Sequence, residues 1–95
     1  MKRLKVVVPW REGLHLRPAA QLVRVGRKFR SQIVLRFDGK IADLRSILSI
    51  LALYGSMGSA LDLVVTGDDE QDAAQAVAQV FASHNSSDSA GGRPA

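Results

Sequence analysis

The stretch Gly13-Leu14-His15-Leu16-Arg17-Pro18-Ala19-Ala20 marks the point where an extended segment turns into a helix. Proline has no backbone N–H, so Pro18 fits only the first turn of a helix, which is expected to begin at about Leu16. Apolar residues then recur at helical spacing and form one stripe: Ala19, Leu22, Val23, Gly26 and Phe29. The stretch therefore predicts a histidine at or next to the N-terminus of an amphipathic helix.

The segments on both sides of this helix alternate between apolar and polar residues, which is the pattern of half-buried strands. Such segments lie at residues 3–8, 32–37 and 61–66. Asp38-Gly39 is a strong hairpin signal and predicts a short strand at residues 40–43 that pairs back. Alternating strands are typical of an antiparallel sheet with one face covered and one face in water.

Two further helices are predicted. Ser46 precedes the apolar run Ile47-Leu48-Ser49-Ile50-Leu51-Ala52-Leu53 and is expected to cap a short helix there. Asp68, Asp69 and Glu70 suit the start of a last helix. Its inner stripe is Ala73, Ala76, Val77, Val80 and Phe81. The predicted order is β-α-β-β-α-β-α, an α+β fold.

The composition describes one small domain. The 95 residues contain no cysteine, which excludes disulfides and thiolate metal sites. No apolar run approaches the roughly 20 residues that span a bilayer, and the basic start lacks the apolar centre of a signal peptide. We expect a cytoplasmic protein without membrane insertion, with a domain at residues 1–83 and a disordered Ser/Gly-rich tail at 84–95.

Charge is distributed unevenly along the chain. The first 45 residues hold 12 Lys/Arg and 3 Asp/Glu, whereas the remaining 50 hold 1 and 6. A basic half indicates either an anionic partner or a solvated face that keeps the protein soluble.

His15 is the candidate reactive group. A helix N-terminus carries unpaired N–H groups and partial positive charge, which favour an anion. An imidazole there is a competent nucleophile, and Arg17 can add charge-assisted hydrogen bonds to a transferred phosphoryl group. The alternative is a polar histidine that only caps the helix. That role explains neither Gly13 nor Arg17.

Residues 13–20 resemble the active-site signature Gly-(Leu/Ile/Met)-His-x-Arg-Pro-Ala of HPr, the phosphocarrier family of the bacterial phosphoenolpyruvate-dependent phosphotransferase system. Arg45-Ser46-Ile47-Leu48 and the apolar residues after it are similar to the second family signature. The resemblance covers about residues 2–83. It implies an open-faced β-sandwich, with four antiparallel strands and three helices on one face.

The resemblance also implies a function in sugar uptake. His15 would accept a phosphoryl group on Nδ1 from phosphorylated Enzyme I and donate it to a IIA protein or domain, with Arg17 stabilising the group. Ser46 matches the serine that an HPr kinase modifies in some bacteria. The implied docking surface is Ile47, Leu48 and Leu51 with a basic rim of Arg24, Arg27 and Arg45. We expect a monomeric carrier rather than an independent enzyme, without a cofactor or a metal.

Two residues depart from the family pattern. Glu12 stands where Ser, Thr or Asn is usual, and its carboxylate is expected to repel a phosphoryl group or to hydrogen-bond the imidazole of His15. Trp10 is also unusual and is expected either to pack over the site or to contact a partner.

Two alternatives stay open on the sequence. One is a regulatory HPr paralogue of a nitrogen-type branch, with the same chemistry and a different outlet, which the apolar run after Ser46 also resembles. The other is a small nucleic-acid module, because Gly55-Ser56-Met57-Gly58 matches the GxxG of KH domains. Against that module, the loop should join a helix to a strand and lacks basic residues, so we expect no nucleic-acid partner.

Overall fold

The computed structural model describes residues 1–82. In chain order the elements are β1 (Lys2–Val7), α1 (Leu16–Gly26), β2 (Gln32–Phe37), β3 (Lys40–Asp43), α2 (Ile47–Leu51), β4 (Ala60–Thr66) and α3 (Glu70–Ala82). The predicted order of elements is confirmed. The predicted end of the domain at residue 83 and the predicted tail at 84–95 lie outside the described residues.

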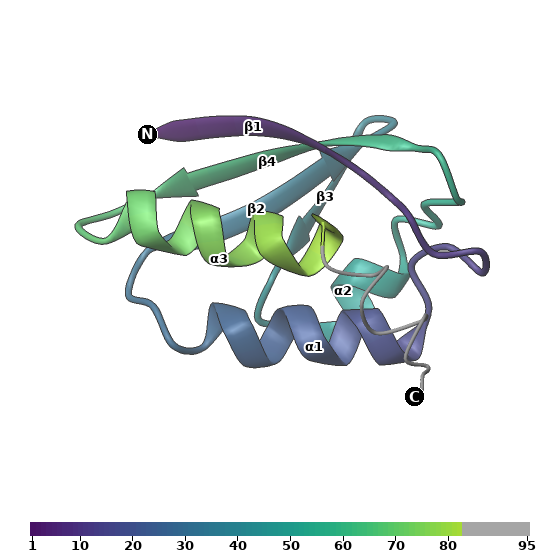
Figure 1. Ribbon diagram of the computed structural model, residues 1–95, viewed down its shortest axis with the longest axis horizontal. Coiled ribbons are helices and arrows are strands. Elements are labelled where there is room, and N and C mark those ends of the chain that lie inside the picture. Colours follow the sequence, from purple (N-terminus) through teal and green to yellow (C-terminus); the bar gives the residue numbers. More distant parts are fainter. Residues whose placement is uncertain (83–95) are drawn as a thin grey trace.

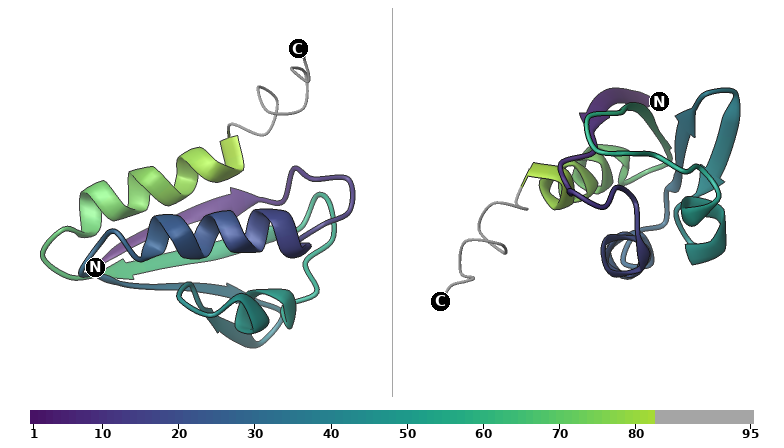
Figure 2. Two further views of the ribbon diagram at one scale, coloured as in Figure 1. Left: turned by 90° about the horizontal axis from the view of Figure 1, so that it is seen from below. Right: turned by 90° about the vertical axis from the view of Figure 1, so that its right-hand side faces the viewer.

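The strands form one antiparallel sheet in the order β1-β4-β2-β3. All three helices lie on one face of this sheet, and the other face is open (Figures 1 and 2). The predicted open-faced β-sandwich is therefore confirmed. Asp38 and Gly39 both have positive φ, 53° and 76°, as a two-residue turn of the I′ type requires between β2 and β3.

The core lies between the covered face of the sheet and the helices. The inward side chains of β2 and β4 are buried, as are most of those in the helical stripes: Ile33, Leu35, Leu61, Leu63, Val65, Ala19, Leu22, Val23, Ala73, Val77, Val80 and Phe81. Ala76 of the predicted stripe in α3 is only partly buried, and Ala74, which was not predicted, is buried. Each buried large aliphatic side chain contributes roughly 1.5–3 kcal/mol. The alternation in β1 points Leu4 inward, yet Leu4 is 37% exposed. It is exposed because β1 lies at the edge of the sheet. Phe29 lies beyond the end of α1 at Gly26, so the helical stripe is shorter than predicted.

Two loops meet at the end of the molecule where α1 begins. The N–H of Leu14, after β1, donates to the carbonyl of Gly55 over 2.8 Å. Val8 donates to the carbonyl of Ser59 over 2.9 Å and accepts from the N–H of Gly58 over 2.8 Å. These bonds hold the β1–α1 loop, which carries His15, against the α2–β4 loop.

Candidate functional site

His15 occupies the N-cap position of α1, with extended backbone angles of φ −99° and ψ −173°. Its side chain makes no capping hydrogen bond, and 34% of that side chain is exposed. The first helical bond is instead made by the His15 carbonyl, which accepts from the N–H of Ala19. The imidazole is therefore at the predicted place but does not cap the helix.

Gly13 and Leu14 fix the backbone that presents His15. The Leu14 side chain is buried in the core, next to its bond to Gly55. Gly13 has φ +76°, and a Cβ built there would lie 2.5 Å from the carbonyl oxygen of Gly55. Only glycine satisfies both the positive φ and the close approach of the two loops.

The first turn of α1 presents two backbone donors beside the imidazole. Pro18 has no N–H, and Ala19 already donates to His15. The N–H groups of Leu16 and Arg17 have no partner among residues 1–82, as is usual for the first N–H groups of a helix. The first turn contains no acidic side chain that would neutralise its partial positive charge.

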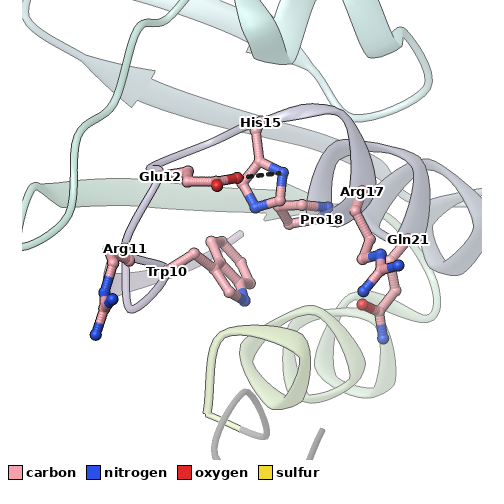
Figure 3. Close-up of a pocket in the computed structure, with 7 residues that line it drawn as sticks. All are labelled: Trp10, Arg11, Glu12, His15, Arg17, Pro18 and Gln21. Carbon is pink, nitrogen blue, oxygen red and sulfur yellow. Dashed lines mark ion pairs between the residues drawn. The ribbon is translucent and has the colours of Figure 1, made fainter. Parts of the chain in front are cut away.

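The imidazole opens onto a pocket of about 300 Å³ that is lined by the β1–α1 loop and the first turns of α1 (Figure 3). Its lining residues are Trp10, Arg11, Glu12, His15, Arg17, Pro18 and Gln21. Arg17 and Gln21 extend side by side along one wall, with Trp10 and Arg11 on the opposite wall. The structure thus places His15 and Arg17 beside one another, with Glu12 and Trp10 lining the same pocket. Of the two roles expected for Trp10, the structure shows packing at the site.

The sequence did not single out Arg11 and Gln21, which also line the pocket. Gln21 is four residues after Arg17, so the two share a helix face, and helical spacing alone places it beside the arginine. Arg11 follows Trp10 in an irregular loop, where no periodic pattern predicts its direction.

Glu12 faces the nitrogen that the family resemblance assigns to phosphorylation. Its Oε1 lies 3.7 Å from Nδ1 of His15 (Figure 3). The Glu12 side chain is 76% exposed, so the contact lies at the mouth of the pocket. The expected proximity of carboxylate and imidazole is therefore present.

The short helix α2 lies beside the N-terminal half of α1 (Figures 1 and 2). Ile50 is fully buried, Ile47 and Leu51 are partly buried against the core, and Leu48 is 79% exposed. Of the implied docking residues on α2, Leu48 alone is thus strongly exposed.

The three arginines of the implied rim differ. Arg24 and Arg27 are exposed on the last turn of α1 and directly after it. Arg45 is also exposed, but its guanidinium donates to the carbonyls of Phe29 and Ser31 over 3.0 and 3.3 Å. Arg45 therefore also joins the α1–β2 loop to the segment before α2.

Ser46 is the N-cap of α2. Its Oγ accepts a hydrogen bond from the N–H of Ser49 over 3.2 Å, which confirms the predicted capping role. The Gly55–Gly58 loop joins α2 to β4, a helix to a strand, as expected. This connection differs from the helix-to-helix loop of a KH domain.

Comparison with known proteins agrees with this geometry. The family model for the PTS HPr component phosphorylation site matches residues 2–83. The chain is 37% identical over 78 residues to the HPr-like protein Crh of Bacillus subtilis, covering 82% of this chain and 92% of Crh. It is 44% identical over 69 residues to the phosphocarrier protein HPr of Lysinibacillus sphaericus, covering 73% and 78%.

The fold comparison gives the same result. The crystal structure of HPr from Thermoanaerobacter tengcongensis superposes with a TM-score of 0.83 and 37% identity, covering 87% of this chain and 93% of that one. Family match, sequence relatives and fold agree over nearly the whole chain. The protein belongs to the HPr family, the phosphocarriers of the phosphotransferase system.

Proposed function

We propose that this protein accepts a phosphoryl group on Nδ1 of His15 and passes it to a partner protein in sugar uptake. The observation that carries the proposal is the imidazole at the start of α1, partly exposed and not used as a cap. It lies beside the N–H groups of Leu16 and Arg17, which have no hydrogen-bond partner in the described part of the chain. The protein is then a carrier that is phosphorylated and dephosphorylated in turn. Catalysis belongs to the complexes it forms with its partners.

The proposed transfer is an exchange of one N–P bond for another. The lone pair of Nδ1 attacks the phosphorus of a phosphohistidine on Enzyme I, which has been charged by phosphoenolpyruvate. The bond from phosphorus to the Enzyme I nitrogen breaks, and its electron pair returns to that nitrogen. The same exchange, with His15 as donor, loads a IIA protein or domain.

The transferred group would be held by charge and by directed donors. The N–H groups of Leu16 and Arg17 and the partial positive charge of the helix start favour phosphoryl oxygens. The exposed Arg17 guanidinium, on the wall of the same pocket, supplies charge-assisted hydrogen bonds.

The proposed docking surface is centred on Leu48 of α2. Exposed apolar side chains at this end of the molecule extend it: Leu16, Tyr54 and Met57, with exposures of 62%, 79% and 60%. Arg24 and Arg27 supply a basic rim. Arg45 adds a further positive charge, and its guanidinium is held in place by its hydrogen bond to the Phe29 carbonyl. An apolar centre with a charged rim is the general anatomy of a protein interface and suits a partner with an acidic border.

We also propose Ser46 as a regulatory site for an HPr kinase. Ser46 lies two residues before the exposed Leu48, and its Oγ is at the helix N-terminus. A phosphate there would place negative charge beside the docking surface.

A regulatory paralogue is the second candidate, and one relative favours it. The HPr-like protein Crh matches 82% of this chain, and solved Crh is described as a catabolite repression HPr. The chemistry at His15 would be unchanged, and the two candidates differ in the protein that receives the group. Offering phosphorylated protein to sugar-type and nitrogen-type IIA proteins separates them.

We propose a monomer that works in the cytoplasm with Enzyme I. HPr of Thermoanaerobacter tengcongensis has also been solved as a dimer, at TM-score 0.71 and 37% identity. Sedimentation equilibrium at several concentrations tests the monomer directly. Within residues 1–82, no helix has the length and apolarity to cross a membrane.

Incubation with Enzyme I and labelled phosphoenolpyruvate tests the proposed function. We expect one phosphate per protein, labile in acid and stable in base, as a phosphohistidine is. His15→Ala should take up none, whereas replacing the second histidine in His84→Ala should leave uptake unchanged. Label that persists on His15→Ala would contradict the proposal.

A further inference from the structure

We propose that Glu12 sets the phosphoryl-transfer potential of this carrier, by placing a carboxylate against the nitrogen that becomes phosphorylated. The inference rests on the proposed function of His15 and assigns a positioning role to a residue that does not itself react. It concerns how readily the group is passed on, not whether it is accepted.

The backbone keeps Glu12 close to the imidazole. The N–H of Gly13 donates to the carbonyl of Trp10 over 2.8 Å, and the N–H of His15 donates to the carbonyl of Gly13 over 2.9 Å. This tight turn brings Oε1 of Glu12 to 3.7 Å from Nδ1 of His15, although most of the Glu12 side chain is exposed to water. Gly55 fixes the turn from the other side through its bond with Leu14.

The pocket therefore gives a phosphoryl group both favourable and unfavourable neighbours. Arg17 and Arg11 bring positive charge to its walls, and Glu12 brings negative charge to the attachment point itself (Figure 3). Before phosphorylation, the carboxylate faces an imidazole nitrogen that attacks with its lone pair. Afterwards, a phosphoryl group with negatively charged oxygens is bonded to that nitrogen, and the carboxylate faces an anion. This repulsion raises the free energy of the phosphorylated state relative to the free one.

The expected size follows from Coulomb's law in a largely aqueous site. One pair of unit charges about 4 Å apart in water changes an equilibrium constant roughly fivefold, and a phosphoryl group carries more than one negative charge. Removing the Glu12 charge should therefore raise the equilibrium constant for phosphorylation by about five- to thirtyfold. Dissolved salt should reduce the effect, because the contact is exposed.

The test measures the phosphorylated fraction at equilibrium with catalytic Enzyme I and fixed concentrations of phosphoenolpyruvate and pyruvate. A catalyst cannot change an equilibrium constant, so any effect of Glu12 on docking does not enter this measurement. Glu12→Gln keeps the shape and removes the charge. Asp68→Asn is the matched control. Asp68 is an exposed acidic residue in the turn between β4 and α3, and this turn lies at the end of the molecule away from the start of α1 (Figure 1).

We expect a higher phosphorylated fraction for Glu12→Gln than for wild type, no change for Asp68→Asn, and a difference that shrinks towards 1 M salt. Equal equilibrium constants for wild type and Glu12→Gln would overturn this inference and leave the proposed function standing. So would a difference between the two equilibrium constants that does not change with salt concentration. A wild-type protein that takes up no phosphate would overturn both.

Discussion

The indole ring of Trp10 packs against the phenyl ring of Phe81, with ring centroids 5.2 Å apart and planes tilted by 44°. This contact joins the loop that carries His15 to the C-terminal end of α3. Trp10 also forms a wall of the pocket beside the imidazole. The loop is therefore anchored by aromatic packing as well as by its hydrogen bonds to the α2–β4 loop.

Removing the indole should loosen this anchor. We expect Trp10→Ala to lower the free energy of unfolding by about 1–3 kcal/mol, because a partly buried aromatic side chain is lost. Trp10→Phe should retain most of that stability, since a ring can still contact Phe81. Urea unfolding followed by circular dichroism measures both, and equal losses for the two variants would contradict a specific ring contact.

Arg17 should matter only when a phosphoryl group is present. No ion pair engages its side chain within residues 1–82, so Arg17→Ala should leave stability within about 0.5 kcal/mol of wild type. A hydrogen bond to a charged group contributes about 1.5–3 kcal/mol, so phosphotransfer should slow by about ten- to hundredfold. Rapid-quench measurement of transfer from Enzyme I checks this, with Arg30→Ala as a control for lost charge. A similar rate for Arg17→Ala and Arg30→Ala would argue against a specific role.

Leu48 and Ile50 allow docking to be separated from folding. Leu48 is 79% exposed and Ile50 is fully buried in the same helix. Leu48→Glu should therefore leave the circular dichroism spectrum unchanged and weaken Enzyme I binding at least tenfold, whereas Ile50→Glu should unfold the protein. Gln75→Glu, on the outer face of α3, controls for the added charge. Normal Enzyme I binding by a folded Leu48→Glu protein would place the docking surface elsewhere.

The sequence predicted the features of fold and site that depend on local pattern. The order of elements, the Asp38-Gly39 hairpin and the Ser46 cap follow from residues within a few positions of one another. The placement of His15 at the start of α1 follows likewise from Pro18 and from the apolar stripe after it.

The features it did not predict join residues that are far apart in the chain. Asp69 lies directly before α3, as expected, and its carbonyl accepts from the N–H of Ala73. What the sequence did not predict is that its carboxylate accepts from the backbone N–H groups of Arg30 and Ser31 and from the Ser31 hydroxyl. The bonds from Arg45 to the α1–β2 loop and the packing of Trp10 on Phe81 are of the same kind. No periodic pattern encodes such contacts, because they depend on how the finished layers stack.

The Asp69 contacts predict an acid-sensitive contribution to stability. The Ser31 hydroxyl, followed by the Arg30 N–H, lowers the pKa of the Asp69 carboxyl below its usual value of 3.8. A folded-state pKa below the unfolded one gives stability that is present above pH 3.8 and is lost as the pH falls through the folded value. Asp69→Asn should therefore be less stable than wild type near pH 7, and the gap should narrow below pH 3.8. Urea unfolding across this range checks the sign. A gap that widens in acid would exclude the linkage.

Ser46 combines a structural role with the proposed regulatory one, and three variants separate them. Its Oγ accepts from the N–H of Ser49, so Ser46→Ala should cost about 1 kcal/mol of stability. Asparagine and aspartate are both good N-caps, and negative charge is favourable at a helix N-terminus. Ser46→Asn and Ser46→Asp should therefore both be about as stable as wild type.

The aspartate and asparagine variants differ in charge alone, so their comparison isolates electrostatics at the docking surface. If an acidic border on Enzyme I meets the surface around Leu48, the charge of Ser46→Asp should weaken binding and slow phosphotransfer several-fold, with a smaller effect in high salt. Ser46→Asn should transfer at the wild-type rate. Stopped-flow transfer at low and high ionic strength makes the comparison. Equal rates for the aspartate and asparagine variants at low salt would mean that a negative charge at this position does not weaken binding of Enzyme I. Ser46 would then be a helix cap alone, and a phosphate there would not regulate transfer by repulsion.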